Sequence, residues 1–369
     1  MPEIILQHVT KRFDKFVAVQ DLDLQIQDRG FITLLGPSGC GKTTTLRMIA
    51  GLETPTSGRI LIDGVPVFDS EKGINLPPNR RDIGFLFQNY ALWPHMTVYE
   101  NIAFGLEMLK WDKARIRKRV DELLALLKIE QFEKRYPAEL SGGQQQRVAI
   151  ARTLAPSPKV LFMDEPLSNL DAKLRQEMRT ELKRLHSDTN STFVYVTHDQ
   201  LEAMTLSTKV CLMDTGVLQQ YAPPLEIYGH PANLFVAEFV GNPTMNFIPA
   251  TVKSASGNRA SLSLLGHDAT FTAKAPLGKL TGSAVLGVRP EFLPIVQGGS
   301  LRGKTYSTLP AGMETTVKLS CGGTMLTSVV FGCVDYTVDT ELPLNIVGDN
   351  IALFDQASGQ SVGFGSVTF

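Results

Sequence analysis

One segment constrains the fold of this chain more than any other, and it reads Gly36-Pro37-Ser38-Gly39-Cys40-Gly41-Lys42-Thr43. It fits the phosphate-loop pattern G-x-x-x-x-G-K-S/T. An apolar run from Phe31 to Leu35 precedes it and predicts a buried parallel strand, and residues 44–50 after it predict a helix. Strand, loop and helix in this order are the context that the motif requires. The segment therefore predicts an α/β domain that binds a nucleotide.

Each residue type in this loop has a chemical reason. Gly36, Gly39 and Gly41 allow positive φ angles, so that successive backbone N–H groups point inward toward phosphate oxygens. The N-terminus of the following helix adds a partial positive charge. Lys42 adds a full charge for the β- and γ-phosphates, and the Thr43 hydroxyl is an Mg²⁺ ligand. The pattern predicts a nucleoside triphosphate with Mg²⁺.

Length and charge narrow the class of protein. The chain has 369 residues, which is long for one ordinary domain and predicts two. Hydrophobic residues make up 43% of it, enough for a large core. Its 36 basic residues nearly balance its 37 acidic ones, so the charge does not indicate a nucleic-acid partner. We see no apolar run of the ~20 residues that span a bilayer, and the first residues do not resemble a signal peptide.

The four cysteines, at positions 40, 211, 321 and 333, lack the spacing of a metal site and do not suggest a disulfide framework. This usage predicts a reduced, cytoplasmic protein. Cys40 lies at a predicted helix N-terminus, a place that can lower the pKa of a thiol and make it reactive. The alternative, which we favour, is that Cys40 is a small spacer in the loop.

The first domain continues as strands and then as helices. Residues 3–27 predict antiparallel strands, and Phe13 among them either stacks on an adenine or is a half-buried strand residue. From Pro94 to about Leu154 the pattern is helical. One apolar helix face is formed by Ile116, Val120, Leu123, Leu124 and Leu127. Basic residues between positions 113 and 119 lie near its polar side, and we interpret them as a solvated face rather than a nucleic-acid patch.

Polar residues follow three of the predicted buried strands, at residues 83–87, 160–163 and 192–197. Strands that alternate with helices and end in polar residues predict an open α/β sheet with its site along that edge. Gln88 and His198 follow the first and last of these strands. Asp164 supplies a carboxylate on the metal side, and Glu165 is able to polarise a water.

A second anion site is predicted near residue 141. Ser141 is a candidate N-cap for the helix that follows, and the glycine-rich start of that helix suits an anion. A chain with one Lys-bearing loop and a second such helix start favours a head-to-tail dimer. In that dimer the loop of one copy faces the Ser-Gly-Gly of the other.

The last third of the chain has a different character. A proline-rich stretch between residues 222 and 243 marks a linker. Beyond it, short alternating segments separated by Gly and Asn/Asp turns predict a small all-β domain, best explained as a barrel. A small barrel is able to bind oligonucleotides, but its balanced charge favours a regulatory or docking role.

The motifs together resemble those of the ABC-transporter ATPases. Leu140–Gln144 is similar to the signature motif of that family, and the phosphate loop, Gln88, residues 160–165, residues 168–171 and His198 follow the order of its other motifs over about residues 3–235. The resemblance implies an α/β P-loop ABC ATPase domain at residues 1–240, with a helical subdomain at about 94–154. A small all-β OB-like (TOBE) regulatory domain is expected at residues 241–369.

The resemblance also implies roles for individual residues. It assigns catalysis to Glu165, His198, Gln88 and Lys42, and metal binding to Thr43, Gln88 and Asp164. The residues expected at ATP are Phe13, Gly36, Pro37, Ser38, Gly39, Cys40, Gly41, Lys42, Thr43, Thr44, Gln88, Ser141, Gly142, Gly143, Gln144 and Asp171. In this set Phe13 is the ring that stacks on adenine. Asp171 couples the two sites, and Ser141–Gln144 close on the ATP of the partner protomer.

Four segments, at residues 87–106, 167–175, 287–291 and 354–359, resemble the maltose and glycerol-phosphate importer ATPases. Trp93, where Tyr is commoner, and a turn at Asp28–Phe31 that is one residue short depart from that pattern. The resemblance implies a homodimer that is peripheral to the cytoplasmic face of a bacterial inner membrane. Its expected partners are two integral-membrane permeases, which dock on residues 89–106, and indirectly an extracytoplasmic solute-binding protein. Any regulatory protein is expected at the C-terminal domain.

The cargo expected from this resemblance is a sugar, a polyol or a glycerol-phosphate derivative. Importers of polyamine, iron or sulfate share the architecture and are the alternative. A soluble, non-transport ABC ATPase is a further alternative, but such proteins carry long coiled-coil arms or tandem ATPase units, and this sequence shows neither.

Overall fold

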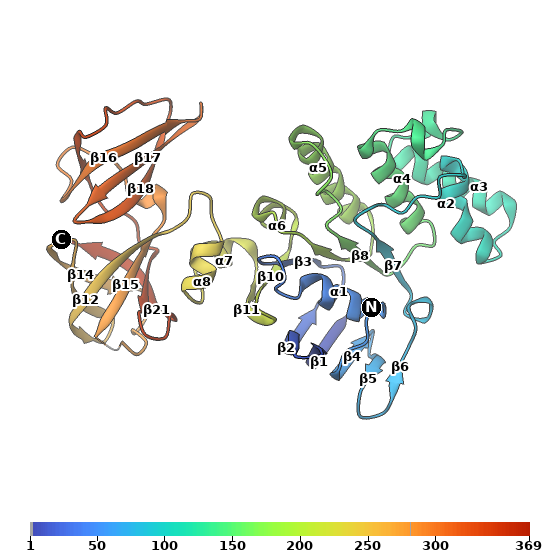
Figure 1. Ribbon diagram of the computed structural model, residues 1–369, viewed down its shortest axis with the longest axis horizontal. Helices are drawn as coiled ribbons and strands as arrows, with labels where there is room; N and C mark the ends of the chain where they lie inside the picture. Colours follow the sequence, from blue (N-terminus) through green and yellow to red (C-terminus); the bar gives the residue numbers. More distant parts are fainter. Residues whose placement is uncertain (1–2, 281) are drawn as a thin grey trace. The chain divides into compact units, whose positions relative to one another are not determined.

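The computed structural model describes residues 3–280 and 282–369. The chain forms two compact units, Met1–Pro224 and Leu225–Phe369 (Figure 1). The first unit combines two sheets with the longer helices of the chain, and the second is mainly β. This architecture confirms the predicted fold class, an α/β ATPase domain followed by a small all-β domain.

The first unit is built on a six-stranded sheet with the order β11-β10-β3-β9-β8-β7. Five of these strands run parallel, and β11 joins the edge antiparallel to β10. Their bounds are β3 (Phe31–Leu35), β7 (Ile83–Leu86), β8 (Val160–Asp164), β9 (Thr192–Val196), β10 (Lys209–Asp214) and β11 (Val217–Ala222). Every residue of β3, β8 and β9 is buried, the apolar pattern of a parallel sheet that is covered on both faces.

The carboxyl ends of the central strands lie level with one another. Leu34 of β3 pairs with Val196 of β9, and Val196 pairs with Asp164 of β8. Because these strands run parallel, the segments that follow them begin at the same edge of the sheet. The phosphate loop follows β3, Glu165 follows β8, and His198 follows β9 by one residue. The register therefore brings these three segments together.

A five-stranded antiparallel sheet with the order β2-β1-β4-β5-β6 completes the β part of this unit. Its strands are β1 (Ile4–Phe13), β2 (Phe16–Ile26), β4 (Ser57–Ile62), β5 (Val65–Asp69) and β6 (Ile74–Asn75). Apolar side chains from both sheets and from α1 (Lys42–Ala50) share one hydrophobic core. This core fixes the helix that follows the phosphate loop.

The predicted helical region contains α2 (Val98–Met108), α3 (Lys113–Leu126) and α4 (Gly142–Leu154), which lie together in Figure 1. The buried positions of α3 are Ile116, Val120, Leu123 and Leu124, as the apolar periodicity predicts. The basic residues of this helix are mostly exposed, which agrees with a solvated face. Two further helices, α5 (Ala172–Asp188) and α6 (Gln200–Leu206), flank β9 in the sequence.

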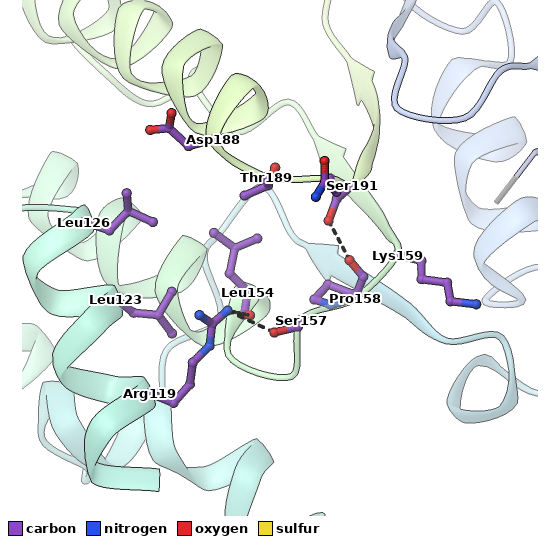
Figure 2. A pocket seen from close by; sticks show the side chains of 11 residues that line it. Arg119, Leu123, Leu126, Leu154, Ser157, Pro158, Lys159, Asp188, Thr189 and Ser191 are labelled. Atoms are coloured by element: carbon purple, nitrogen blue, oxygen red, sulfur yellow. Dashed lines mark hydrogen bonds between the residues drawn. The ribbon is translucent and has the colours of Figure 1, made fainter. Parts of the chain in front are cut away.

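A groove of about 350 Å³ lies between α3, the connection from α4 to β8, and the end of α5 (Figure 2). Arg119 reaches across from α3 and donates to the Leu154 carbonyl at 3.0 Å and to the Ser157 hydroxyl at 3.1 Å. On the far side, the Ser191 hydroxyl donates to the Pro158 carbonyl at 2.7 Å. These bonds hold the α4–β8 connection, which leads into the amino end of β8, from both sides.

The second unit contains a closed barrel with the order β12-β13-β14-β21-β20-β15 and a four-stranded sheet with the order β18-β17-β16-β19. The barrel strands are β12 (Asn246–Ser256), β13 (Arg259–Leu264), β14 (His267–Ala273), β15 (Ser283–Val288), β20 (Ile351–Asp355) and β21 (Ser361–Thr368). The other sheet consists of β16 (Leu301–Pro310), β17 (Glu314–Cys321), β18 (Thr324–Phe331) and β19 (Glu341–Leu344). The barrel was predicted, whereas the separate sheet was not.

Residues 225–240, which were expected in the ATPase domain, pack in the structure with the second unit. They form α7 (Pro224–Gly229) and α8 (Leu234–Phe239). Arg289, which is 2% exposed, explains this packing. Its guanidinium donates to the Tyr228 carbonyl at 2.9 Å, to the Ala237 carbonyl at 3.2 Å and to the Val240 carbonyl. It also lies 4.1 Å from the centre of the Tyr228 ring.

Replacing Arg289 by methionine is expected to lower the free energy of unfolding by about 3 kcal/mol, because buried carbonyl groups lose their donor. Urea unfolding of the full chain, followed by tyrosine and tryptophan fluorescence, measures the change. The exposed Arg259 gives a matched control, and R259M is expected to change stability by less than about 0.5 kcal/mol. Equal stabilities of R289M and R259M would show that Arg289 does not hold residues 225–240.

Candidate functional site

The phosphate loop runs from the end of β3 to the N-terminus of α1. Gly41 caps this helix with a φ of 100°, and a Cβ there would lie 2.4 Å from the Ala18 carbonyl oxygen. Gly39 has a φ of 80°, and among the described residues no atom beyond Gly39 and its two chain neighbours lies within 4 Å of a Cβ placed there. No side chain of the described residues caps the first turn of α1, so its N–H groups are available to an anion. The loop therefore fits a phosphate group.

The two glycines predict different effects of adding a methyl group. G41A is expected to lower the free energy of unfolding by at least about 3 kcal/mol, because it combines a left-handed φ with a backbone clash. G39A is the matched control, and its unfavourable φ alone is expected to cost about 1–2 kcal/mol. Urea unfolding without nucleotide measures both values. If G41A is as stable as G39A, the close approach to Ala18 does not constrain the loop.

Lys42 lies over the loop that contains it. Its ammonium group donates to the carbonyls of Gly36 and Pro37, both at 2.8 Å, and the residue is only 5% exposed. Ser38 and Gly39 at the tip of the loop are exposed, whereas Pro37, Thr43 and Thr44 are half-buried. The loop thus combines a buried positive charge with a helix start that no described side chain caps.

Cys40 is buried within the loop, 2% exposed, and its Sγ lies 3.6 Å from the Lys42 ammonium. Burial raises the pKa of this thiol, and the charge of Lys42 only partly opposes that effect. The structure therefore contradicts the lowered pKa that a helix N-terminus suggests. A Cβ at Gly36 would lie 2.7 Å from the Cys40 sulfur, so the small thiol fills the space behind the loop.

Asp164, at the end of β8, faces two residues of α1. The Thr43 hydroxyl donates to one carboxylate oxygen at 3.0 Å, and the Arg47 guanidinium lies 3.4 Å from the other. Burial raises the pKa of Asp164, while these two contacts oppose the rise. A hydroxyl and a carboxylate side by side are the hard oxygen donors that Mg²⁺ prefers, so this pair fits the metal.

Glu165 and His198 meet at the same edge of the sheet. A Glu165 carboxylate oxygen lies 3.4 Å from Nδ1 of His198. The Glu165 backbone has a φ of 46°, an unusual value for this residue type, and its N–H donates to the Val196 carbonyl at 3.0 Å. Strained backbone of this kind concentrates at functional sites, and here it lies at the residue directly after β8.

Gln88 is placed differently from the metal-ligand expectation. Its side-chain amide donates to the Ser168 hydroxyl at 3.3 Å, and its backbone carbonyl accepts from the Asn169 side chain at 3.3 Å. Within the described ranges, no hydrogen bond links Gln88 to Thr43 or Asp164. The structure therefore brings Gln88 to the segment after β8 rather than to the metal pair.

Ser141 caps α4, as predicted. Its hydroxyl accepts from the Gln144 N–H at 3.4 Å, and the Gln144 side chain accepts from the Ser141 N–H at 2.9 Å. A Cβ at Gly143 would lie 2.6 Å from Leu174, so this glycine also lets α4 approach α5 closely. Among the residues that the structure describes, none of positions 141–144 is hydrogen-bonded to the phosphate loop of the same chain.

Asp171 and Phe13 complete the predicted set. The Asp171 side chain accepts from the Leu174 N–H at 3.0 Å and caps α5. Phe13 ends β1, is 43% exposed, and has the Lys11 ammonium 4.5 Å from its ring centre. The ring is thus exposed at the end of the strand, where stacking on an adenine stays a prediction.

Sequence reasoning missed Arg47. It follows Thr43 by four residues on α1, so both side chains lie on one helix face and reach Asp164 together. That spacing was the available signal, and it becomes informative only when the partner carboxylate is known.

The site unites an anion-binding helix start, a buried cation and a hydroxyl–carboxylate pair with a second carboxylate that lies next to a histidine. Together with the parallel sheet, this combination defines a P-loop protein that hydrolyses nucleoside triphosphates.

Comparison with known proteins identifies the family. Residues 19–168 match the ABC transporter family, and residues 241–293 match the MalK OB fold domain family. The chain is 44% identical over 375 residues to the trehalose/maltose import ATP-binding protein MalK of Thermococcus litoralis, covering 98% of this chain and 100% of that protein. It is 47% identical over 326 residues to the spermidine/putrescine import ATP-binding protein PotA of Roseobacter denitrificans, covering 86% and 87%. This chain belongs to the family of ABC transporter ATP-binding proteins, and it is an ATPase that uses ATP with Mg²⁺.

Solved structures agree with this family. A dimeric ATP-binding cassette in a post-hydrolysis state, bound to ADP and Pi, matches at a TM-score of 0.52 and 33% identity, covering 60% of this chain and 98% of that chain. Among the helices of the described residues, none combines the length and the apolar character needed to cross a membrane.

Proposed function

We propose that this chain is the ATP-hydrolysing subunit of a binding-protein-dependent importer whose cargo is a sugar, a polyol or a glycerol-phosphate derivative. The observation that carries the proposal is the second unit, whose MalK-type OB fold follows the ATPase unit. One relative that is similar over 98% of the chain is named for trehalose and maltose import, which supports a carbohydrate cargo. The similarity to a spermidine/putrescine import protein makes polyamine uptake the second candidate.

We infer residue roles that the geometry at the sheet edge supports. Lys42 and the N–H groups of the loop bind the β- and γ-phosphates. Thr43 and Asp164 hold Mg²⁺, which supplies charge neutralisation at the phosphates when bound. Glu165 accepts a proton from the attacking water or orients it, and His198 contacts the γ-phosphate.

A head-to-tail homodimer completes the site. Residues 141–144 are not hydrogen-bonded to the loop of their own chain in the described structure, and their helix start suits an anion. The solved cassette that this chain resembles is described as dimeric. We infer that Ser141–Gln144 close on the ATP of the partner copy, and that Asp171 lies at the junction of the two sites.

The permease-docking surface is proposed at residues 89–106. Asn101, which is fully buried, makes this segment rigid, because its side chain donates to three carbonyls, accepts from the Trp93 N–H at 2.9 Å and so anchors the turn before α2. The Trp93 ring lies 4.5 Å from Phe104 and 4.7 Å from Arg152. A fixed turn bearing aromatic side chains suits a helix of a membrane partner. We infer that the chain is peripheral to the cytoplasmic face of the inner membrane.

The test is a pull-down of the tagged protein from detergent-solubilised native membranes, with the bound proteins identified by mass spectrometry. Two multi-span permeases and a binding protein are expected. Calorimetry of that binding protein against maltose, sorbitol, a glycerol phosphodiester and spermidine then assigns the cargo. Spermidine binding without carbohydrate binding would contradict the carbohydrate proposal, and recovery without any membrane protein would contradict the importer.

A further inference from the structure

Thr197, the residue before His198, is locked by a buried carboxylate. It is 3% exposed, and its hydroxyl donates to Glu202 Oε2 at 2.6 Å while accepting from the Asp199 N–H at 3.0 Å. The Tyr195 hydroxyl donates to the same Glu202 oxygen at 2.7 Å. Glu202 itself, on α6, is 3% exposed. One carboxylate thus joins the end of β9 and the residue after it to α6, the helix after His198.

This hydrogen-bond network around Glu202 is better explained as fixing the positions of its residues than as stabilising the fold. Removing a carboxylate from water is unfavourable, and apolar residues of similar size often stabilise a core as well or better. Burial raises the pKa of Glu202, and the hydrogen bonds from Thr197 and Tyr195 oppose the rise. What the network provides is a single geometry for the backbone on the N-terminal side of His198, because charge-assisted hydrogen bonds are strong and directional.

Asp199, the residue after His198, is held on the other side. Its carboxylate caps α6 by accepting from the Leu201 N–H at 2.8 Å and from the Glu202 N–H at 3.2 Å. It also lies 3.6 Å from the Arg175 guanidinium. Arg175 donates in addition to the Leu170 carbonyl at 3.0 Å. The same arginine therefore contacts the segment before Asp171 and the segment after His198.

The His198 side chain has little else to fix it. It is 61% exposed, and its described contact is the 3.4 Å approach to Glu165. The placement of the imidazole therefore depends on the backbone that its two neighbours hold.

We propose that Thr197, Glu202 and Arg175 are positioning residues, which hold His198 at the catalytic edge and tie it to the segment that ends at Asp171. The inference rests on the proposed role of His198. A displacement of about 1 Å at a reacting group lowers turnover by up to ~100-fold. Loss of the contacts made by Thr197, Glu202 and Arg175, which we call the brace, is therefore expected to have a measurable effect on kcat.

The test compares two variants at position 197 by steady-state ATP hydrolysis. T197V keeps the shape but removes the hydroxyl, and kcat is expected to fall at least about tenfold while KM for ATP changes less than about twofold. T197S restores the hydroxyl and is expected to keep at least half of the wild-type kcat. T180V, at an exposed position of α5, controls for the same replacement and is expected to match the wild type.

A double variant separates this inference from the proposed function. If Thr197 acts through His198, the pair T197V/H198A is expected to be no slower than H198A alone. An additional tenfold loss in the double variant, or a wild-type kcat in T197V, would overturn the brace. Wild-type hydrolysis by H198A would instead overturn the proposed role of His198.

R175K is the second test, for the case in which T197V does not fold. The Arg175 side chain is 32% exposed, so a lysine is expected to be tolerated at this position. Lysine lacks the forked guanidinium that contacts Leu170 and Asp199 together. A fall in kcat of at least about threefold, with KM unchanged and an unaltered thermal midpoint, supports the brace. A wild-type kcat contradicts it.

Discussion

Replacing Glu165 by glutamine is expected to lower the ATP turnover number by about a thousandfold, within the range that a general base contributes. Glutamine keeps the size of the side chain but cannot accept the proton of the attacking water. The neighbouring His198 Nδ1, 3.4 Å away, does not replace it, because we assign that residue to the γ-phosphate. Phosphate release at saturating ATP and Mg²⁺ measures the loss.

The same variant is expected to bind ATP with wild-type affinity, because the phosphate loop and the Thr43–Asp164 pair are unchanged. Bound but unhydrolysed ATP then holds the closed dimer, which size-exclusion chromatography detects as a doubled mass. E177Q, at an exposed position of α5, is the matched control and should leave turnover unchanged. Hydrolysis by E165Q at the wild-type rate would refute the assignment of Glu165 as the base.

Replacing Lys42 by methionine is expected to weaken ATP binding by about 10–100-fold, since hydrogen bonds to charged groups contribute about 1.5–3 kcal/mol. The buried stem of Lys42 makes methionine a better choice than alanine, because it fills the same space and leaves no cavity. The ammonium also donates to the carbonyls of Gly36 and Pro37, so the loop loses two internal bonds as well.

Equilibrium binding of a fluorescent ATP analogue with Mg²⁺ measures the effect of K42M. K42M is expected to lower the affinity for the ATP analogue more than the affinity for a nucleoside without phosphates, because the ammonium group acts on the phosphates. K118M, at an exposed position of α3, is the control for loss of one positive charge. Equal affinity of K42M and wild type would place the phosphates elsewhere on the protein.

Much of the site could be predicted because its signals are local. The phosphate loop needs glycines and a lysine at fixed spacing, and the register of the parallel strands then brings Glu165 and His198 to it. Ser141 is recognisable as a helix cap from its own segment, since the glutamine that completes the capping box lies three residues away. The apolar face of α3 follows in the same way from its period.

The remaining features depend on contacts between residues distant in the sequence. The Arg47–Asp164 pair and the Gln88–Ser168 bond each join separate segments, and neither residue type reveals its partner. The second unit shows the same limit, because the barrel followed from alternating strands while the four-stranded sheet beside it did not. The pKa of Cys40 could not be predicted from its segment either. Its position at a helix N-terminus alone would lower the pKa of the thiol, whereas burial raises it.

Local pattern therefore specifies the class of this protein: the nucleotide loop, the strand ends that carry its polar residues, the helix caps and the β character of the last third. The tertiary structure decides which residues distant in the sequence contact one another. Residues 225–240 pack with the second unit because Arg289, far along the chain, donates to their carbonyls. Thr197 is locked because Glu202 is buried beneath it. Both outcomes depend on which side chains lose water together, and that is a property of the packed chain rather than of any segment.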